Sequence, residues 1–319
     1  MLVVAALGGN ALLQRGQPLT AQVQRENVKV AARALADIVR AGHQLVITHG
    51  NGPQVGLLAL QNDAYKPEES YPLDVLGAQT AGMIGYLIEQ ELENELQHRQ
   101  PVVTLLTQVV VDLNDPAFAK PTKYIGPVYS QAEAQSRAAL AGWQVAQDGD
   151  KWRRVVASPK PVDIPDLQVL KLLVEKNVVL VCNGGGGIPV VRAADNSLQG
   201  IEAVIDKDLS SAFLANKLGA DVLLLLTDVD AVYQDFATPE AKPFDTLTVA
   251  QCDEMNLPAG SMGPKINAAC SFAQSGGFSA IGRLADALAL LSGQAGTHIV
   301  ADTAQLGSAW NTVASVARL

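Results

Sequence analysis

The sequence predicts an α/β protein in which helices cover both faces of a mainly parallel open sheet, with one protruding subdomain inserted. Strand-like apolar runs alternate with stretches of helical periodicity from the first residues onward, which is typical of consecutive βαβ units. The run Asp221–Thr227 is a continuous apolar strand, as expected at the centre of a parallel sheet. Between residues 112 and 161 the alternation stops, which predicts the insertion.

The composition of the 319 residues is that of a compact globular protein, with 48% hydrophobic and 17% charged residues. The net charge of −9 argues against nucleic acid or an anionic membrane as a partner, so an anionic ligand needs a few placed cations. Three cysteines without metal-like spacing, no basic leader and no apolar run of about 18 residues predict a cytoplasmic protein without a membrane span.

The first half of the chain contains two strands that end in glycine-rich loops. The predicted strand Leu2–Leu7 runs straight into Gly8-Gly9-Asn10-Ala11, and a second strand, Gln44–Thr48, runs into His49-Gly50-Asn51-Gly52-Pro53. The other elements predicted here are an amphipathic helix over Thr20–Ala41 closed by Gly42, a helix from Pro53 through Gln61, a helix over Asp74–His98 and a strand over Pro101–Val111.

Residues 112–161 are predicted to form a lid or subdomain inserted into the sheet domain. The stretch holds five prolines, two tryptophans and a basic cluster at Lys151, Arg153 and Arg154. An ordinary surface excursion is the alternative, but about 50 residues outside the regular alternation are more often functional than idle.

Four consecutive glycines, Gly184–Gly187, follow the predicted strand Val178–Asn183. A turn that needs positive φ explains one or two glycines, whereas four predict a close approach of the backbone to a ligand. The other predicted elements are helices over Pro165–Lys176, Leu209–Leu218, Thr248–Asn256 and Leu284–Leu291, a helix opened by Gly260–Lys265 that runs to about Gln274, and strands over Ile201–Ile205, Ser279–Gly282 and Thr297–Ala301.

Three glycine loops and two lysines predict a site for a phosphate group. Loops that leave strands and precede helices present backbone N–H donors and positive helix ends, which favour anions. The loops match neither a Walker A motif nor Gly-x-Gly-x-x-Gly, which excludes those two assignments. Lys207, between Asp206 and Asp208, and Lys265 stand at predicted helix starts. The helix dipole favours acidic side chains at this end, so a lysine there indicates a functional role. Fixed lysines beside such loops suffice for phosphoryl transfer, which needs mainly positioning and positive charge.

A set of specific motifs stands in one order along residues 2–299. The motifs are Ala6-Leu7-Gly8-Gly9-Asn10-Ala11, His49-Gly50-Asn51-Gly52-Pro53-Gln54-Val55-Gly56, Leu106-Thr107-Gln108-Val109-Val110-Val111-Asp112, Pro121-Thr122-Lys123, Ile125-Gly126-Pro127, Ser158-Pro159-Lys160-Pro161, Gly184 to Val190, Glu202 to Asp208, and Gly260 to Lys265. In this order the set resembles the carbamate kinases, a branch of the amino-acid kinase superfamily. The resemblance implies an α/β/α sandwich, a homodimer, and the Mg²⁺-dependent, reversible reaction of carbamoyl phosphate with ADP to give ATP and carbamate.

The resemblance also implies roles for individual residues. Lys123, in the insertion, would reach the transferring phosphoryl group, while Lys207 and Lys265 would neutralise nucleotide phosphates and Asp208 would hold those lysines. Carbamate is already an anionic nucleophile, so no general base is required, and His49 is interpreted as a packing residue. The remaining positions are Gly8, Gly9, Asn10, Gly50, Asn51 and Gly52 around carbamate and the phosphoryl group, and Tyr233 and Met262 in the nucleotide pocket.

These assignments change the interpretation of the four glycines at 184–187. With the phosphoryl group at the two N-terminal loops, the run becomes a hinge of the nucleotide half beside Lys207 and Asp208.

The predicted organisation is a single domain over residues 1–301. Its carbamate and phosphoryl half extends to about residue 200 and includes the lid 112–161, the nucleotide half covers about 201–301, and residues 302–319 form an extension without a predicted role.

The chain departs from the carbamate kinase pattern at Tyr124, Ala157, Asn267 and Gly282-Arg283. None of these is a proposed phosphate ligand, but the first two touch the lid. Two alternatives to a carbamate kinase therefore stay open: a related kinase of another small carboxylate, and a nucleotide-binding regulatory subunit without turnover.

Overall fold

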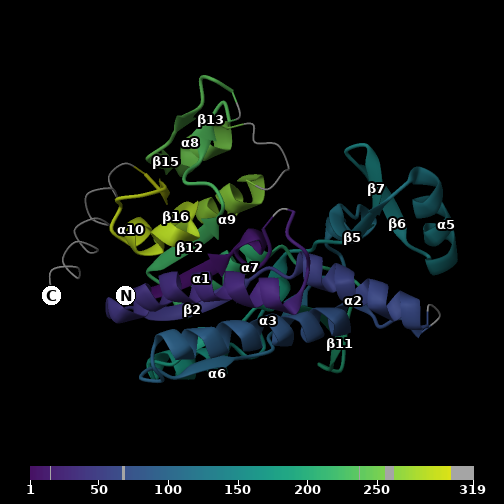
Figure 1. Cartoon of the computed structure of the whole chain (residues 1–319), viewed down its shortest axis with the longest axis horizontal. Coiled ribbons are helices and arrows are strands. Elements are labelled where there is room, and N and C mark those ends of the chain that lie inside the picture. Colours follow the sequence, from purple (N-terminus) through teal and green to yellow (C-terminus); the bar gives the residue numbers. More distant parts are fainter. Residues whose placement is uncertain (15, 67–68, 237, 256–261, 303–319) are drawn as a thin grey trace.

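An eight-stranded sheet forms the centre of the molecule (Figure 1). The structure is a computed structural model, and it describes residues 1–14, 16–66, 69–236, 238–255 and 262–302. Neighbouring strands run parallel throughout this sheet except for β16 and β17, so the predicted mainly parallel sheet is confirmed. In sheet order the strands are β15 (Thr246–Thr248), β17 (Thr297–Val300), β16 (Phe278–Arg283), β12 (Val222–Thr227), β1 (Leu2–Leu7), β2 (Gln44–His49), β9 (Val179–Val181) and β3 (Val102–Thr104).

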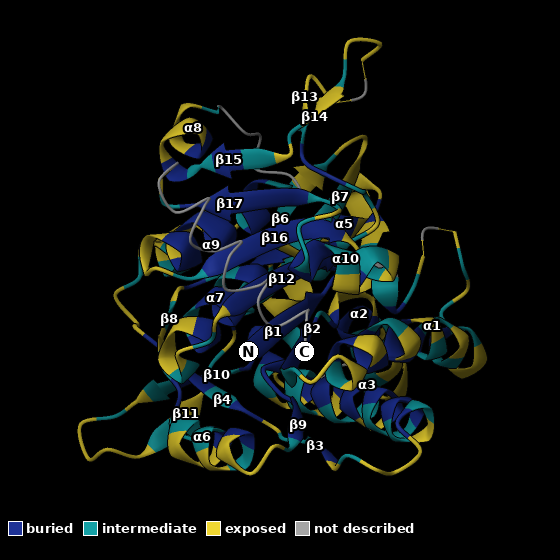
Figure 2. Ribbon diagram, turned by 90° about the vertical axis from the view of Figure 1, so that its left-hand side faces the viewer, coloured by how far each residue is buried: buried dark blue, intermediate teal, exposed yellow. Residues whose placement is uncertain are grey.

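Helices cover both faces of this sheet because its strands are apolar on both sides. Along β1, Val4 and Ala6 belong to one buried cluster, whereas Val3 and Ala5 belong to another on the opposite face. Figure 2 shows the strands buried between partly exposed helices, which is the expected α/β/α sandwich. The first cluster includes residues of α6 (Leu167–Glu175), α7 (Lys207–Leu218) and α9 (Met262–Gln274), and the second includes residues of α1 (Ala21–Arg40), α3 (Leu73–Glu95) and α10 (Ala287–Leu291).

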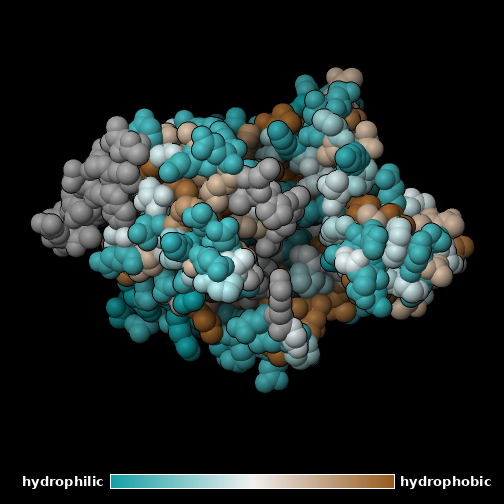
Figure 3. Space-filling view, turned by 90° about the horizontal axis from the view of Figure 1, so that it is seen from above, coloured by the Kyte–Doolittle hydropathy of each residue, from teal (hydrophilic) through white to brown (hydrophobic). Residues whose placement is uncertain are grey.

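The predicted insertion forms a small subdomain that protrudes from the body, at the right of Figures 1 and 3. Its antiparallel strands are β5 (Lys123–Tyr129), β7 (Lys151–Val156) and β6 (Gln144–Asp148), with α5 (Gln131–Ala141) packed against them. The chain enters and leaves it through a second sheet, in the order β11 (Leu198–Gly200), β10 (Ile188–Arg192), β4 (Gln108–Val111) and β8 (Pro161–Asp163).

Shorter elements complete the described part of the chain. They are α2 (Gly52–Tyr65), α4 (Pro116–Ala119), α8 (Val249–Glu254), the hairpin of β13 (Tyr233–Gln234) and β14 (Lys242–Pro243), and the 3₁₀ turns η1 (Gly9–Ala11), η3 (Gly184–Gly186) and η4 (Leu284–Asp286). Within the described residues, no helix has the length and apolar character needed to cross a membrane.

Two predicted strands differ from the structure. The predicted strand Pro101–Val111 is split, because β3 pairs with β9 in the main sheet whereas β4 pairs with β10 in the second sheet. The predicted strand Ile201–Ile205 is absent, since this described segment makes only an isolated bridge between Ala203 and Ala157 at the base of the subdomain. Of the predicted extension over residues 302–319, residues 303–319 lie outside the described residues.

Candidate active site

The loops after β1, β2 and β9 meet at one edge of the sheet because these strands are adjacent and parallel. The N–H of Gly8 donates to the carbonyl of Leu226, at the end of neighbouring strand β12, at 2.9 Å. A methyl group added at Gly50 would lie 3.8 Å from the nitrogen of Gly9 and 4.0 Å from Cδ of Lys207. The structure therefore places the second N-terminal loop against both the first loop and Lys207, the lysine predicted to act with them.

Helix α7 starts beside these loops and carries two of the predicted charged residues. Asp206 is its N-cap, and the Oδ1 of Asp206 accepts the N–H of Asp208 at 2.9 Å. Buried hydroxyl groups join the first turn to the sheet: Thr48 Oγ1 lies 2.6 Å from Ser211 Oγ, and the Ser211 hydroxyl contacts the carbonyl of Lys207 at 2.7 Å. This layer fixes the start of α7 relative to β2.

Asp208 holds lysines from two helices in a buried cluster. Its Oδ1 lies 2.7 Å from Nζ of Lys207, and its Oδ2 accepts Nζ of Lys265 on α9 at 3.0 Å. The three side chains are between 7% and 11% exposed. Burial acts to raise the pKa of Asp208, but the charges of the two lysines outweigh it and lower that pKa to about 2. Burial also lowers the pKa of Lys207, against the charge of Asp208.

Lys123 reaches the same helix terminus from the subdomain. It is the first residue of β5, and its Nζ donates to Oδ2 of Asp206 at 2.8 Å. The side chain of Lys123 is 37% exposed and that of Asp206 only 14% exposed, so this pair lies at the rim of the site. Lysines from β5, α7 and α9 thus gather around the N-terminus of α7.

The four glycines at 184–187 form a packing junction at the foot of the site. A methyl group at Gly184 would lie 2.7 Å from Nε2 of His49, and one at Gly185 would overlap the side-chain amide of Asn51. Gly186 and Gly187 abut a backbone carbonyl and a valine side chain in the same way, and the last three glycines have φ values of 69°, 94° and 90°. Close packing at all four positions and positive φ at the last three therefore account for the glycines, and Gly185 and Gly187 also line a small cavity with Asn51 and Gly52.

His49 and Asn51 belong to this junction. Burial lowers the pKa of His49 to about 4, so the ring is neutral at physiological pH, and its Nδ1 lies 3.1 Å from the carbonyl of Gly50. This environment agrees with the predicted packing role. The Nδ2 of Asn51 donates to Oγ1 of Thr80 on α3 at 2.9 Å, which ties the second glycine loop to that helix. The side chain of Asn10 lies outside what the structure describes.

The two predicted nucleotide-pocket residues stand apart from the lysine cluster. Tyr233, on β13, donates its hydroxyl to both carboxylate oxygens of Asp230, at 3.0 and 3.1 Å. Met262 opens α9 three residues before Lys265 and packs against the core cluster that contains Val4 and Ala6, while Gly260 and Ser261 lie outside the described residues. In the described part of the chain, neither side chain makes a hydrogen bond with the three lysines.

The departures from the carbamate kinase pattern have identifiable surroundings. Nη2 of Arg283 lies 3.7 Å from Oδ2 of Asp230, the same carboxylate that accepts the Tyr233 hydroxyl. The Tyr124 hydroxyl donates to the carbonyl of Gln147 inside the subdomain at 2.6 Å, and Ala157 is buried at the subdomain base. The side chain of Asn267 is exposed on α9.

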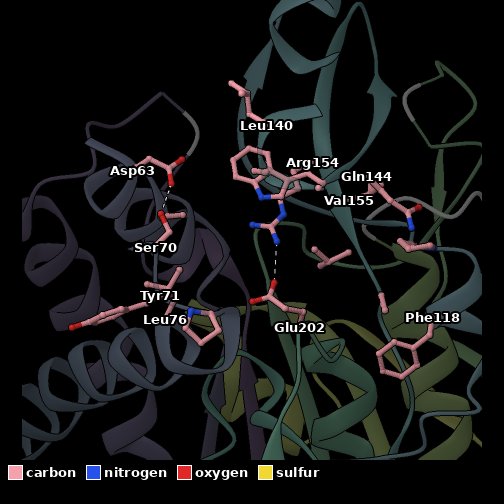
Figure 4. Close-up of a pocket in the computed structure, with 18 residues that line it drawn as sticks. Asp63, Ser70, Tyr71, Leu76, Phe118, Leu140, Gln144, Arg154, Val155 and Glu202 are labelled. Carbon is pink, nitrogen blue, oxygen red and sulfur yellow. Dashed lines mark hydrogen bonds and ion pairs between the residues drawn. The ribbon is translucent and has the colours of Figure 1, made fainter. Parts of the chain in front are cut away.

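A cleft of about 660 Å³ separates the subdomain from α2 and α3 (Figure 4). Arg154 points across it toward Glu202, and Nη2 and Oε2 lie 2.9 Å apart, while the guanidinium carbon of Arg154 lies 4.7 Å from the ring centroid of Trp143. None of the predicted site residues is among the described residues that line this cleft. It lies beside the subdomain base, and its ion pair ties the subdomain to the body.

Sequence reasoning missed Asp206 as a site residue. The resemblance assigned a holding role to Asp208 and none to Asp206. In the structure the cap is Asp206, and the same carboxylate binds Lys123. An aspartate directly before a predicted helix is a recognised N-cap signal, so the cap could have been predicted, although the contact with Lys123 could not.

Comparisons with known proteins assign the chain to a family. The profile of the amino acid kinase family matches residues 1–281, and the chain belongs to that family. A carbamate kinase of Rhizobium meliloti is 55% identical over 302 residues, which cover 94% of this chain and 93% of the relative. A carbamate kinase of Haemophilus influenzae is 52% identical over 304 residues, covering 95% and 98% respectively. Within the amino acid kinase family, the chain is therefore a member of the carbamate kinases.

A solved structure agrees with this assignment. The carbamate kinase of Giardia lamblia bound to AMP-PNP superposes with a TM-score of 0.87 at 39% identity, covering 94% of this chain and 98% of that chain. The amino-acid kinase fold expected from the motifs is confirmed.

Proposed function

We propose that the chain catalyses reversible phosphoryl transfer between carbamoyl phosphate and ADP, giving ATP and carbamate, and that it works mainly toward ATP. The observation that carries the proposal is the gathering of Lys123, Lys207 and Lys265 at the N-terminus of α7, next to the loops that contain Gly9 and Gly50. Membership of the carbamate kinases supports the choice of substrate.

The lysine cluster supplies the positive charge that phosphoryl transfer requires. Lys207 and Lys265 would bind the phosphates of the nucleotide, and Asp208 keeps their ammonium groups about 3 Å from one shared carboxylate. Lys123 would bind the transferring group from the subdomain side. The loops at Gly8-Gly9 and Gly50–Gly52 would bind carbamate and phosphate oxygens through N–H groups other than those of Gly8 and Gly50, which donate to the carbonyls of Leu226 and Leu7. Tyr233 and Met262 would line the pocket of the nucleotide.

The reaction needs no proton carrier. A β-phosphate oxygen of ADP attacks the phosphorus of carbamoyl phosphate, a new P–O bond forms, and carbamate leaves with the electron pair of the broken P–O bond. Because no proton changes place, catalysis rests on alignment and on positive charge around the phosphoryl oxygens. The buried, neutral His49 is consistent with this chemistry.

Mg²⁺ would accompany the nucleotide. This ion keeps several waters and is held by phosphate oxygens with one or two carboxylates. No group of three His, Cys, Asp or Glu side chains suited to a metal occurs among the described residues, and the carboxylates of Asp206 and Asp208 are already paired with lysines. The residues present therefore fit an ion that arrives as part of the nucleotide substrate.

The two departures in the subdomain leave the lysine cluster intact. The Tyr124 hydroxyl donates to Gln147 on β6, within the subdomain, and Ala157 is buried, so neither departure replaces a residue of the lysine cluster. A substrate panel with acetyl phosphate and other small acyl phosphates tests the choice of carbamoyl phosphate, and a clear preference for one of them would favour the related small-carboxylate kinase.

An assay of the purified chain tests the proposed activity. ATP formed from ADP, Mg²⁺ and carbamoyl phosphate is coupled to hexokinase and a dehydrogenase, and turnover is expected only with all components present. Absence of ATP formation by folded protein would sink the proposal and leave a nucleotide-binding regulatory subunit.

Two lysines on α7 provide a matched comparison for this assay. Lys207→Met removes a buried site cation and is expected to lower kcat/KM by about 100-fold. Lys217→Met makes the same chemical change in the exposed last turn of the same helix and should leave activity close to that of the parent. Equal losses in the two variants would show that general effects of helix charge explain the result.

Assembly and location stay predictions. We infer a homodimer and a cytoplasmic location from the resemblance and the composition, and neither nucleic acid nor a membrane is an expected partner.

A further inference from the structure

Asp206 joins the subdomain to the helix that carries the site charges. Its Oδ1 accepts the N–H of Asp208 at 2.9 Å and that of Leu209 at 3.2 Å. Its Oδ2 accepts Nζ of Lys123 at 2.8 Å. One carboxylate thus connects the first residue of β5 with the first turn of α7, and it does so at the edge where the glycine loops meet.

We propose that Asp206 is a positioning residue for phosphoryl transfer, which holds Lys123 over the N-terminus of α7 so that its ammonium group faces the transferring phosphoryl group. This proposal rests on the proposed function. An ammonium group has three N–H donors, and among the described residues Asp206 is the one acceptor of Lys123, which leaves two donors for phosphate oxygens. The contact with Asp206 therefore does not have to break when substrate binds.

The need for such an acceptor follows from the position of Lys123. Its side chain is long and 37% exposed, so without a partner it would sample many rotamers in solvent. Asp206 is itself fixed, because two backbone N–H groups bind its other oxygen and its side chain is only 14% exposed. A fixed acceptor restricts the lysine before the substrate arrives, which is the effect expected of a preorganised site.

The surrounding contacts place the whole subdomain on the same segment. Residues 202–206 contact the subdomain at three points: the carboxylate of Glu202 pairs with Arg154, the N–H of Val204 donates to the carbonyl of Ala157 at 3.0 Å, and Asp206 pairs with Lys123. The first two contacts hold the C-terminal half of β7, the strand that pairs with β5. The third acts on the side chain that would touch the substrate.

A different role would give the opposite result. If Asp206 withheld Lys123 from the phosphoryl group, the pair would be an autoinhibitory contact, and its removal would increase activity. If Asp206 acted only as a helix cap, its loss would affect activity whether or not Lys123 were present. The three possibilities differ in their dependence on Lys123.

A double-mutant cycle in the full-length protein separates these roles. Asp206→Asn keeps an oxygen that can cap α7 but removes the charge that binds Lys123. Asp206→Ser, which also retains a cap, is the second variant. Each is combined with Lys123→Ala, and Asp148→Asn is the matched control because Asp148 pairs with Arg153 inside the subdomain, at 3.2 Å, without linking it to the body. The measured quantities are kcat and KM for carbamoyl phosphate and for ADP.

We expect Asp206→Asn to lower kcat by about tenfold in the parent, with KM for ADP unchanged, and to have almost no effect in the Lys123→Ala background. Asp206→Ser should behave in the same way, and Asp148→Asn should resemble the parent. Equal losses in both backgrounds would overturn the proposal in favour of a cap alone, and a gain in activity would overturn it in favour of a withheld lysine.

A readout that does not use turnover keeps the proposal separate from the proposed function. Pulse acetylation followed by mass spectrometry measures how readily the Lys123 amine reacts, and removal of its carboxylate partner should make it react severalfold faster. Unchanged labelling of Lys123 in Asp206→Asn would contradict the pairing itself. Lack of turnover in the parent, together with accelerated labelling in the variant, would refute the kinase activity and leave the pairing intact.

Discussion

Two aspartates flank Lys207, and the structure gives them separate tasks. Asp206 binds backbone N–H groups and Lys123, whereas Asp208 binds Lys207 and Lys265. Asp208 is 7% exposed, so its carboxylate is stabilised by the lysine charges and not by water. Removal of that carboxylate leaves two buried ammonium groups without an opposite charge.

Asp208→Asn is therefore expected to destabilise the protein by about 3 kcal/mol at pH 7, because one partner of a buried ion cluster is lost. The pKa of Asp208 is lowered from 3.8 to about 2 in the folded state, so its contribution is complete above about pH 4 and is lost as the pH falls through about 2. Urea unfolding of parent and variant between pH 7 and pH 3 measures both effects, with the difference shrinking toward pH 3. Equal stability at pH 7 would contradict the buried cluster.

The sequence was sufficient to predict the lysines of this site, but not the acid that caps α7 or the partner of Lys123. Lys207, Lys265 and Lys123 could be selected because they occupy helix starts or motif positions, and the structure brings all three to one helix terminus. Which acid caps α7 depends on the residue at which the helix begins, and such boundaries are uncertain by one or two residues. The pairing of Lys123 with Asp206 spans 83 positions and follows from tertiary structure alone.

At the scale of elements, the glycine run after β9 is a joint between packed layers. Its backbone lies against β2, α3, β4, the loop at Asn51 and the segment before α7, so neighbours leave no room for a side chain at any residue of the run. In the sequence these glycines resemble a ligand-binding loop, whereas in the structure they allow neighbouring elements to pack closely. A glycine-rich pattern by itself does not distinguish an approaching ligand from an approaching backbone.

Gly185→Ala and Gly219→Ala form a matched pair that tests this role. The two glycines have nearly the same φ, 69° and 68°, but only Gly185 has a neighbour, the amide of Asn51, where a methyl group would lie. Gly219→Ala should cost about 1 kcal/mol for the left-handed backbone, and Gly185→Ala should cost about 3 kcal/mol because packing is also disturbed. Thermal and urea unfolding measure the two values. Similar costs would indicate that φ alone requires glycine at 185.

The strand predictions failed where the strands available for pairing, rather than the apolar pattern, determine whether a segment forms a strand. The apolar run before residue 111 has suitable side chains throughout, but the chain passes from one sheet to another between β3 and β4. The segment 201–205 is apolar except for Glu202, yet it lies across the subdomain base, where Ala157 offers a single bridge. Periodicity reports on burial, and both segments contain buried residues without being continuous strands.

At the scale of the whole molecule, the alternation of elements was sufficient to predict a mainly parallel sheet covered on both faces, since βαβ units have few alternatives. The protrusion was predicted from its prolines and its break in pattern. The family could be identified only from ordered motifs, because many unrelated activities share this layered architecture.

The expected homodimer is the prediction that belongs to this scale. Val30 on α1 and Tyr86 on α3 are each 54% exposed, and these two helices pack on each other, so large apolar side chains are available on this layer for burial by a second copy. Static light scattering should give twice the 33.5 kDa mass of the chain. A mass equal to one chain over a range of micromolar concentrations would refute the dimer.

The antiparallel pairing of β4 with β8 has a consequence for how such molecules diversify. Val111 and Pro161 are register partners, so the chain leaves the body and returns to it on adjacent strands. The whole protrusion is topologically equivalent to the turn of a hairpin. Subdomains of different size or substrate preference can therefore be exchanged at this junction while the sheet, the two lysine-bearing helices and the nucleotide half keep their order. Residues 111 and 161 are thus natural junctions for the construction of chimaeric kinases.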